Sequence, residues 1–292
     1  MDCPVAFHAR ENPDRIALLW GKRSLSWGNL NDYVHGTCRA LKEIGVRPNN
    51  RFAVLSTNTL ETIIILLSAW RAGASVLVLD PALSLSIGRK ILDQYKIDLL
   101  FSDTKDYKAF SGQRRTVILN KVICKHNDLF LSHKLPGINP DSSGLLLVRN
   151  AAQELAAYNT VDYGQLFHCA EEDNQKTAYG STKIWLLPFP LHHIWGQRIL
   201  FRGLAGGGAI VLPEFESDFL NDPAQFSITL GFYKITHIFC PLVQLGELVR
   251  NSAVLASLRC LDAILVEQGS PDSTLLDKAS GLSIPLVVSI NG

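Results

Sequence analysis

The chain has 292 residues, enough for about two domains or one large one, and 47% of its residues are hydrophobic. Its 28 lysine and arginine residues against 27 aspartate and glutamate residues leave a net charge of +1. The composition is that of a globular protein with a sizeable core, and it excludes the charged surfaces that bind nucleic acid or anionic membranes.

The N-terminus, Met1–Arg15, lacks the basic stretch and apolar stretch of a secretory signal. The most hydrophobic run, Ile63–Trp70, is far shorter than the roughly 20 residues that span a bilayer, so it predicts a buried helix. Six cysteines are scattered without a Cys-x-x-Cys pair, and we expect them to be reduced, buried, small hydrophobic residues. They are Cys3, Cys38, Cys124, Cys169, Cys240 and Cys260. These features predict a cytoplasmic protein.

The first half of the chain alternates strand-like and helix-like segments. The predicted strands are 15–20 and 23–27, which form a hairpin around Gly21-Lys22, then 51–56, 74–81, 97–103 and 115–120. The predicted helices are 30–45, 58–73 and 85–96. Asn58 and Glu61 resemble a capping box at the start of the second helix, and Gly73 is placed to end it.

A linker-like stretch, 135–144, separates this first series of strands and helices from a second series. We therefore expect subdomains at 1–140 and 141–292. The predicted strands are 145–148, 183–188, 209–213, 236–241, 261–266 and 285–290. The predicted helices are 161–171, one after His193, 221–234, 242–252 and 273–280. Strands separated by helices of this length predict an α/β fold with doubly wound, mostly parallel sheets in two layered subdomains.

The segment Leu186–Glu214 raises three alternatives: a phosphate-binding loop, a metal site or the wall of a pocket. Phosphate loops lie between a strand and the following helix, whereas Gly206–Gly208 follow a helix and precede a strand, which favours a helix stop and tight turn. His192 and His193 point different ways and lack a third ligand at suitable spacing, so we predict no metal site.

The pocket wall is the remaining alternative. In a helix that starts near His193, Gln197 shares its face at four residues' distance, and Arg198 and Arg202 form a neighbouring stripe. A polar-tipped face with two cations suits a small-molecule carboxylate ligand. A helix with one solvated arginine stripe is an equally acceptable interpretation of the spacing.

Pro190–Gly196, with the sequence PLHHIWG, resembles the Pro-Leu-Phe-His-x-x-Gly motif of the adenylate-forming (AMP-binding) acyl-CoA synthetases. Gly196–Pro213 is most similar to the o-succinylbenzoate–CoA ligases of menaquinone synthesis. Further stretches follow in the family's order, namely 12–32, 45–81, 235–249, 255–271 and 284–292. The resemblance implies the fold of the acyl-CoA synthetase N-terminal domain, ATP with Mg²⁺ and CoA as cofactors, and activation of a carboxylate. It also implies that His193 shapes the acyl pocket.

The family's phosphate loop reads Thr-Ser-Gly-(Ser/Thr)-(Thr)-Gly-x-Pro-Lys and follows a strand. Here the strand is followed by RNAAQELAA, in which Asn150 and Gln153 fall where glycines belong and Ala156 falls where the lysine belongs. Side chains intrude where phosphate oxygens must lie, and no lysine faces the leaving pyrophosphate. Arg149 is the one nearby cation in this stretch. These substitutions place ATP binding in doubt.

Other stretches depart from the family as well. The Gly-Gly-Ala-Pro segment that lines the adenine pocket corresponds to residues 267–271, including Gly269 and Ser270. Asn291 and Gly292 resemble the start of the Tyr-Gly-x-Thr-Glu motif, without its threonine and glutamate. We therefore expect a truncated family domain without the C-terminal lid, and no catalytic residue is assigned.

Two functions stay open on the sequence. One is a divergent acyl–CoA ligase, and the other is a non-catalytic relative, or pseudoenzyme, that binds a carboxylate or a protein partner. A nucleotide-dependent dehydrogenase is rejected, because no strand leads into Gly-x-Gly-x-x-Gly. The strand at 285–290 is expected to present an unpaired edge, which a homodimer or a second chain would complete.

Overall fold

A computed structural model of the chain describes residues 3–103, 112, 114–125, 144–148, 158–213, 222–266, 281 and 286–288. The chain groups into two compact units, each discontinuous in sequence. Unit 1 comprises Met1–Arg15, Leu25–Phe167 and Pro190–Gln197, and unit 2 comprises Ile16–Ser24, His168–Phe189 and Arg198–Gly292. The subdomain boundary expected at residue 140, and the linker around it, lie outside the described residues and stay predictions.

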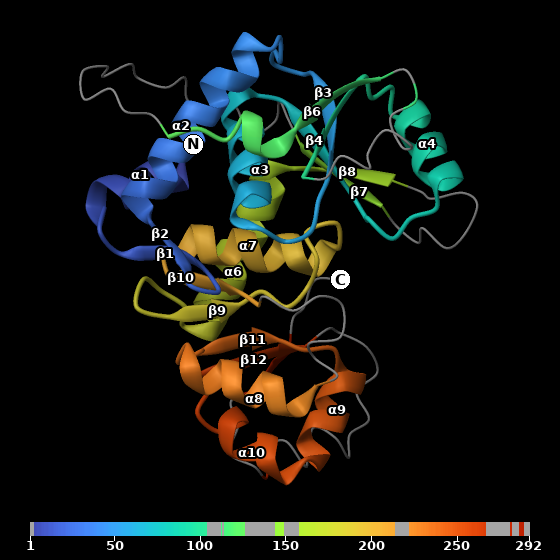
Figure 1. Cartoon of the computed structure of the whole chain (residues 1–292). Coiled ribbons are helices and arrows are strands. Elements are labelled where there is room, and N and C mark those ends of the chain that lie inside the picture. Colours follow the sequence, from blue (N-terminus) through green and yellow to red (C-terminus); the bar gives the residue numbers. More distant parts are fainter. Residues whose placement is uncertain are drawn as a thin grey trace. The chain divides into compact units, whose positions relative to one another are not determined.

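Unit 1 holds a six-stranded sheet in the order β6-β5-β3-β4-β7-β8. Its strands are β3 (Arg51–Leu55), β4 (Ser75–Leu79), β5 (Leu99–Ser102), β6 (Arg115–Ile118), β7 (Gly144–Val148) and β8 (Tyr158–Asp162). All neighbours pair in parallel except β7 and β8. Its helices are α1 (Pro4–Glu11), α2 (Trp27–Glu43), α3 (Leu60–Ala72) and α4 (Leu85–Gln94), with a short 3-10 turn at Leu119–Lys121. Figure 1 shows α2 and α3 on one side of this sheet and α4 on the other.

Helix α3 is the central packing element of unit 1. Every residue of it except Glu61 is buried, which explains why the run Ile63–Trp70 is apolar on all sides. Its N-cap is Thr59, whose hydroxyl accepts from the Thr62 amide, so the capping box predicted at Asn58 is wrong. Gly73 ends the helix in the left-handed conformation, as predicted.

Unit 2 holds a seven-stranded sheet in the order β13-β12-β11-β9-β10-β1-β2. Its strands are β1 (Ile16–Trp20), β2 (Arg23–Ser26), β9 (Ile184–Leu186), β10 (Ala209–Leu212), β11 (His237–Phe239), β12 (Ala263–Val266) and β13 (Leu286–Val288). The helices around it are α6 (Tyr163–Thr177), α7 (Ile194–Gly206), α8 (Pro223–Phe232), α9 (Leu242–Arg250) and α10 (Ser252–Leu258). The first residues of α6 and α7 belong to unit 1. Pairing is parallel from β13 to β1, which confirms the predicted doubly wound α/β fold.

Alternate residues of β10 face opposite helix layers. Val211 belongs to the core that α8, α9 and α10 form with the sheet, whereas Ile210 packs against Gly203 of α7. Gly206 and Gly208 leave room for the Tyr179 side chain, and Gly207 has a φ of 70°. The three glycines are therefore a helix stop and a tight turn under a tyrosine, as predicted, and not a phosphate loop.

Several elements were not predicted. The sequence analysis predicts no separate element for helix α1, strand β8 or helix α10. All six cysteines are free, but the expectation that all are buried is wrong, because Cys124 and Cys260 are exposed. The predicted helix at 273–280 lies outside the described residues. Among the described helices, none combines the length and the apolar character that a membrane crossing requires.

Strand β13 lies at an edge of the seven-stranded sheet. Of the strands that the structure describes, none pairs with its outer side, and the unpaired edge expected for 285–290 stays a prediction. Completion of this edge by a second copy or a second chain stays a prediction.

Candidate functional site

The carboxyl ends of the parallel strands of unit 1 meet at one edge of the sheet, where open α/β sheets bind their ligands. The chain leaves β3 toward β4 on one side and leaves β5 toward β6 on the other, so the strand order reverses between β3 and β5. At this point the Ser56 hydroxyl donates to an Asp103 carboxylate oxygen at 2.7 Å, and Thr62 donates to Ser56 at 3.0 Å. The polar groups at the switch point thus satisfy one another.

The segment Pro190–Gln197 belongs to unit 1 and is held to this edge by two polar contacts. The Leu191 amide donates to Asn58 Oδ1 at 2.8 Å, just beyond β3. The His192 ring nitrogen Nε2 lies 3.8 Å from Asp80 Oδ2, just beyond β4. Burial lowers the pKa of His192, and the Asp80 carboxylate only partly opposes this, so the ring is neutral at pH 7. The contact is therefore polar and not a full ion pair.

His193 caps helix α7. Its backbone carbonyl accepts from the Gln197 amide at 3.3 Å, and its Nδ1 accepts from the Trp195 amide at 3.3 Å. A neutral ring whose Nδ1 accepts carries its proton on Nε2. His193 itself is exposed.

Gln197 is fully buried. Its Nε2 donates to the Leu191 carbonyl at 2.8 Å, and its Oε1 has no hydrogen-bond partner among the described residues. The carbonyl oxygen of Leu191 requires a donor, which fixes the orientation of the amide. The unused group of Gln197 is thus an acceptor, which cannot donate a hydrogen bond to a carboxylate.

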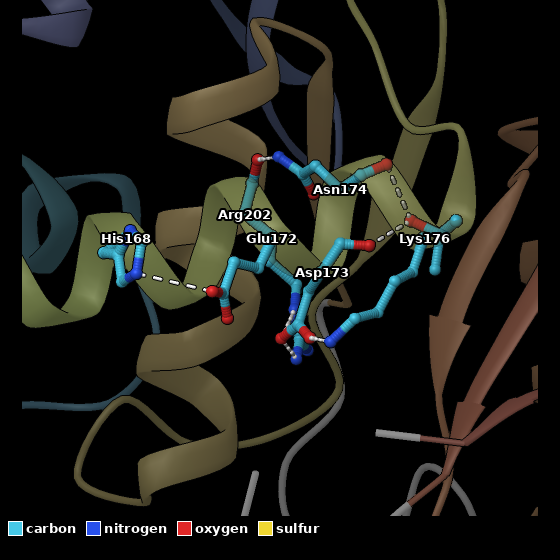
Figure 2. A network of polar contacts seen from close by, with 7 residues as sticks. His168, Glu172, Asp173, Asn174, Lys176 and Arg202 are labelled. Carbon is cyan, nitrogen blue, oxygen red and sulfur yellow. Dashed lines mark hydrogen bonds and ion pairs between the residues drawn. The ribbon is translucent and has the colours of Figure 1, made fainter. Parts of the chain in front are cut away.

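Arg202 lies in unit 2 and is 1% exposed. Its Nε donates to Asp173 Oδ2 at 3.1 Å, its Nη2 contacts the same oxygen, and its guanidinium lies 5.7 Å from the centre of the Trp185 ring. Figure 2 shows this pair between α6 and α7, with Lys176 on the other Asp173 oxygen at 3.9 Å and Asn174 donating to the Arg202 carbonyl. Burial lowers the pKa of Arg202, and Asp173 opposes this. The Arg202 charge is therefore neutralised inside the protein.

Arg198 is partly exposed, one turn before Arg202 on the same helix, and its charge adds to the lowering of the Arg202 pKa. The boundary between the two units falls between Gln197 and Arg198. Of the two arginines of the predicted stripe, only Arg198 reaches the surface.

The segment predicted to replace the phosphate loop connects β7 to β8. These strands pair antiparallel, with Val148 opposite Tyr158, and β7 pairs in parallel with β4. Arg149, Asn150, Gln153 and Ala156 themselves lie outside the described residues, as do Gly269, Ser270, Asn291 and Gly292.

A polar depression lined by Asp93, Asp98, Arg114 and Arg115 lies elsewhere in unit 1. Asp98 precedes β5, and Arg114 and Arg115 stand at the start of β6, so this depression is at the amino ends of the strands. Arg114 is paired with Asp93 and donates to the Ile97 carbonyl at 2.8 Å. This depression is an ion-paired surface away from the carboxyl edge.

Sequence reasoning missed the residues that anchor the site. Asp80 directly follows β4 and Asn58 comes three residues after the end of β3, positions that predict residues at the ligand edge of a parallel sheet. For Asn58 this position was not used as a prediction, because its spacing to Glu61 also fits a helix capping box. Asp173 gave no signal, since its spacing on α6 is that of an ordinary surface carboxylate.

Asn58→Ala should release the Leu191 segment from the carboxyl edge. Loss of one hydrogen bond should lower the free energy of unfolding by about 1 kcal/mol and should speed amide exchange at Leu191. The measurement is native-state hydrogen exchange, with Asn58→Asp as the control that keeps the acceptor oxygen. Unchanged exchange at Leu191 in the alanine variant would show that the contact holds nothing in place.

Residues 5–143 match the family described as AMP-binding enzyme. The 2-succinylbenzoate–CoA ligase of Bacillus cereus strain AH820 is 22% identical over 285 residues, which cover 94% of this chain and 55% of that protein. Gramicidin S synthase 2 of Brevibacillus brevis is 23% identical over 264 residues, covering 86% of this chain and 6% of that protein. The chain therefore spans about half the length of the first of these relatives, and a small part of the second.

Solved structures share the fold. The unliganded o-succinylbenzoate coenzyme A synthetase of Bacillus subtilis superposes with a TM-score of 0.81 and 17% identity, over 98% of this chain and 58% of that one. The N-terminal subdomain of Klebsiella oxytoca NpsA, in complex with 3-hydroxybenzoyl-AMSN, gives a TM-score of 0.84 and 14% identity, over 98% and 70%. At these identities the likeness shows the fold alone.

Proposed function

From the match of residues 5–143 to the AMP-binding enzyme family, we propose that the chain is an acyl–CoA-ligase-like protein that binds a carboxylate without activating it. It is related to the 2-succinylbenzoate–CoA ligases. The Bacillus subtilis relative has been solved in complex with ATP and magnesium ion. We propose that the residues of this chain do not hold that group, because the connection between β7 and β8 lacks the family's glycines and lysine.

One observation carries the proposal: the composition of the connection between β7 and β8. Residues 149–157 read RNAAQELAA and contain neither glycine nor lysine. A phosphate cradle needs backbone amides that oxygens can approach, and every residue here carries a β-carbon. The two charged residues are Arg149 and Glu154, so their charges cancel where a triphosphate would need positive charge.

The size of the expected defect follows from the number of lost groups. Removing a single preorganised donor from a charge-stabilising site costs on the order of 10²–10³ in rate. This connection lacks the lysine and the glycines together, so we expect adenylate formation below detection. The partly exposed Arg198 remains the cation for a ligand carboxylate.

The alternative is that the chain, or a longer protein that contains it, is a divergent acyl–CoA ligase. The collinear similarity over 94% of the chain to a 2-succinylbenzoate–CoA ligase favours this alternative. It requires ATP-dependent activation of a carboxylate and transfer of the acyl group to CoA.

A pyrophosphate-release assay with ATP, Mg²⁺ and o-succinylbenzoate separates the two. We expect no turnover above the protein-free background, with the Bacillus subtilis synthetase as the positive control. Calorimetry on the same protein should show no saturable ATP binding but should show o-succinylbenzoate binding that weakens in Arg198→Ala. Robust turnover, or tight ATP binding, would refute the proposal.

A repaired loop tests the reason for the defect. The triple change Asn150→Gly, Gln153→Gly and Ala156→Lys restores the glycines and the lysine of the family pattern. We expect it to gain measurable ATP affinity, because backbone approach and a cation return together. If the repaired chain still binds no nucleotide, the connection between β7 and β8 is not the cause.

A further inference from the structure

Arg71 is a buried cation with no carboxylate partner among the described residues. It lies in the last turn of α3, is 4% exposed, and forms no ion pair with any carboxylate of the described residues. Its Nη2 donates to Asn31 Oδ1 at 3.0 Å, and its Nε has no partner among those residues. Buried charges in proteins are normally paired, because an isolated ion loses its hydration without compensation. Among the described residues, Arg71 therefore has only uncharged hydrogen-bond partners from Asn31 and Cys3.

Arg71 Nη1 also donates to the Asn31 carbonyl at 3.5 Å, and the third acceptor of Arg71 is a thiol sulfur. Arg71 Nη2 lies 3.1 Å from Cys3 Sγ, in donor geometry. Cys3 is the N-cap of α1, its side chain caps no helix amide, and the first turn of α1 holds no acidic residue. Sulfur beside a guanidinium and at a helix N-terminus is the setting in which proteins stabilise thiolate anions. Cys3 is also partly exposed, so a reagent can reach it.

We propose that Cys3 is a covalent modification site for soft electrophiles, with the buried Arg71 guanidinium as the counter-ion of its thiolate. The proton of the thiol goes to solvent, and the thiolate sulfur then attacks an electrophilic carbon. A sulfur–carbon bond forms as the bond from that carbon to its leaving group breaks, and the leaving group departs as an anion. This site is independent of the proposed carboxylate pocket.

The other cysteines allow the proposal to be distinguished from an order of reactivity that follows exposure alone. Cys124 and Cys260 are exposed, so accessibility alone predicts that they react before Cys3. Burial of the sulfur and the nearby Glu43 carboxylate raise the pKa of Cys124, and Cys260 Sγ donates to the Ala256 carbonyl at 3.4 Å. Cys38 and Cys240 are buried, and burial raises the pKa of both, that of Cys240 to about 12. The proposal thus reverses the order that exposure predicts.

The experiment is competitive alkylation of the native chain with limiting iodoacetamide, read out by peptide mass spectrometry. We expect Cys3 to react about tenfold faster than Cys124 or Cys260, a preference typical of cation-stabilised thiolates. Cys3→Ser should remove this fast phase and leave the other peptides unchanged. Labelling of Cys124 or Cys260 ahead of Cys3 would overturn the proposal.

Two further measurements assign the effect to Arg71. Arg71→Gln should abolish the preference, whereas Arg71→Lys, which keeps a cation, should retain part of it. Because the glutamine variant could fail to fold, the wild-type chain is also labelled in guanidinium chloride, where the contact with Arg71 is lost. A Cys3 preference that persists in the denatured chain, or in a folded Arg71→Gln variant, would show that the sequence around Cys3 and not Arg71 causes it.

Discussion

Asp173→Ala lowers the free energy of unfolding by about 3–5 kcal/mol, because it leaves the Arg202 charge buried without its partner. The neighbourhood offers no replacement, since Arg202 Nη1 already lacks a partner among the described residues and the adjacent surface is the Trp185 ring. Chemical denaturation followed by circular dichroism measures the change. We expect the transition midpoint to fall and its slope to stay constant.

An exposed ion pair of the same unit is the matched control. Lys183 Nζ lies 2.8 Å from Asp262 Oδ2, with side chains 34% and 44% exposed, so Asp262→Ala should cost less than about 1 kcal/mol. The double variant Asp173→Ala with Arg202→Met should recover much of the loss, since no buried charge remains. If Asp173→Ala costs no more than Asp262→Ala, the buried pair is not a structural element of unit 2.

Gly208→Ala destabilises the chain by about 1–3 kcal/mol or more, because a β-carbon at this position overlaps the Tyr179 hydroxyl and the Lys183 backbone carbonyl. A flexible side chain could move aside, but the carbonyl belongs to the chain that leads into β9 and cannot move without shifting the strand. Thermal and urea unfolding measure the loss.

The control for this substitution is Gly231→Ala in helix α8. Nothing lies within 4 Å of the added β-carbon there, so the change should be neutral or stabilising by about 0.5–1 kcal/mol through helix propensity. Equal effects of the two substitutions would contradict the close packing of Tyr179 under the glycine run.

The sequence predicted the secondary structure of the parallel core well, because that information is local. Buried strands such as β3 and β4 are short apolar runs in the sequence. Gly73 ends helix α3 in the left-handed conformation, which glycine adopts without steric strain. The order of strands and helices then implied parallel sheets, since βαβ connections admit few alternatives. The composition of the β7–β8 connection, on which the proposed function rests, is likewise a property of the sequence alone.

Only the tertiary structure decided which polar side chains form hydrogen bonds or ion pairs with other parts of the protein and are therefore not free to contact a ligand. Asn58 resembles a helix cap locally, yet it accepts from an amide 133 positions away in the sequence. Arg202 resembles a solvated or ligand-binding cation locally, yet Asp173 on another helix buries and neutralises it. Spacing along one helix specifies which residues share a face, but it carries no information about which element covers that face, and burial depends on that element.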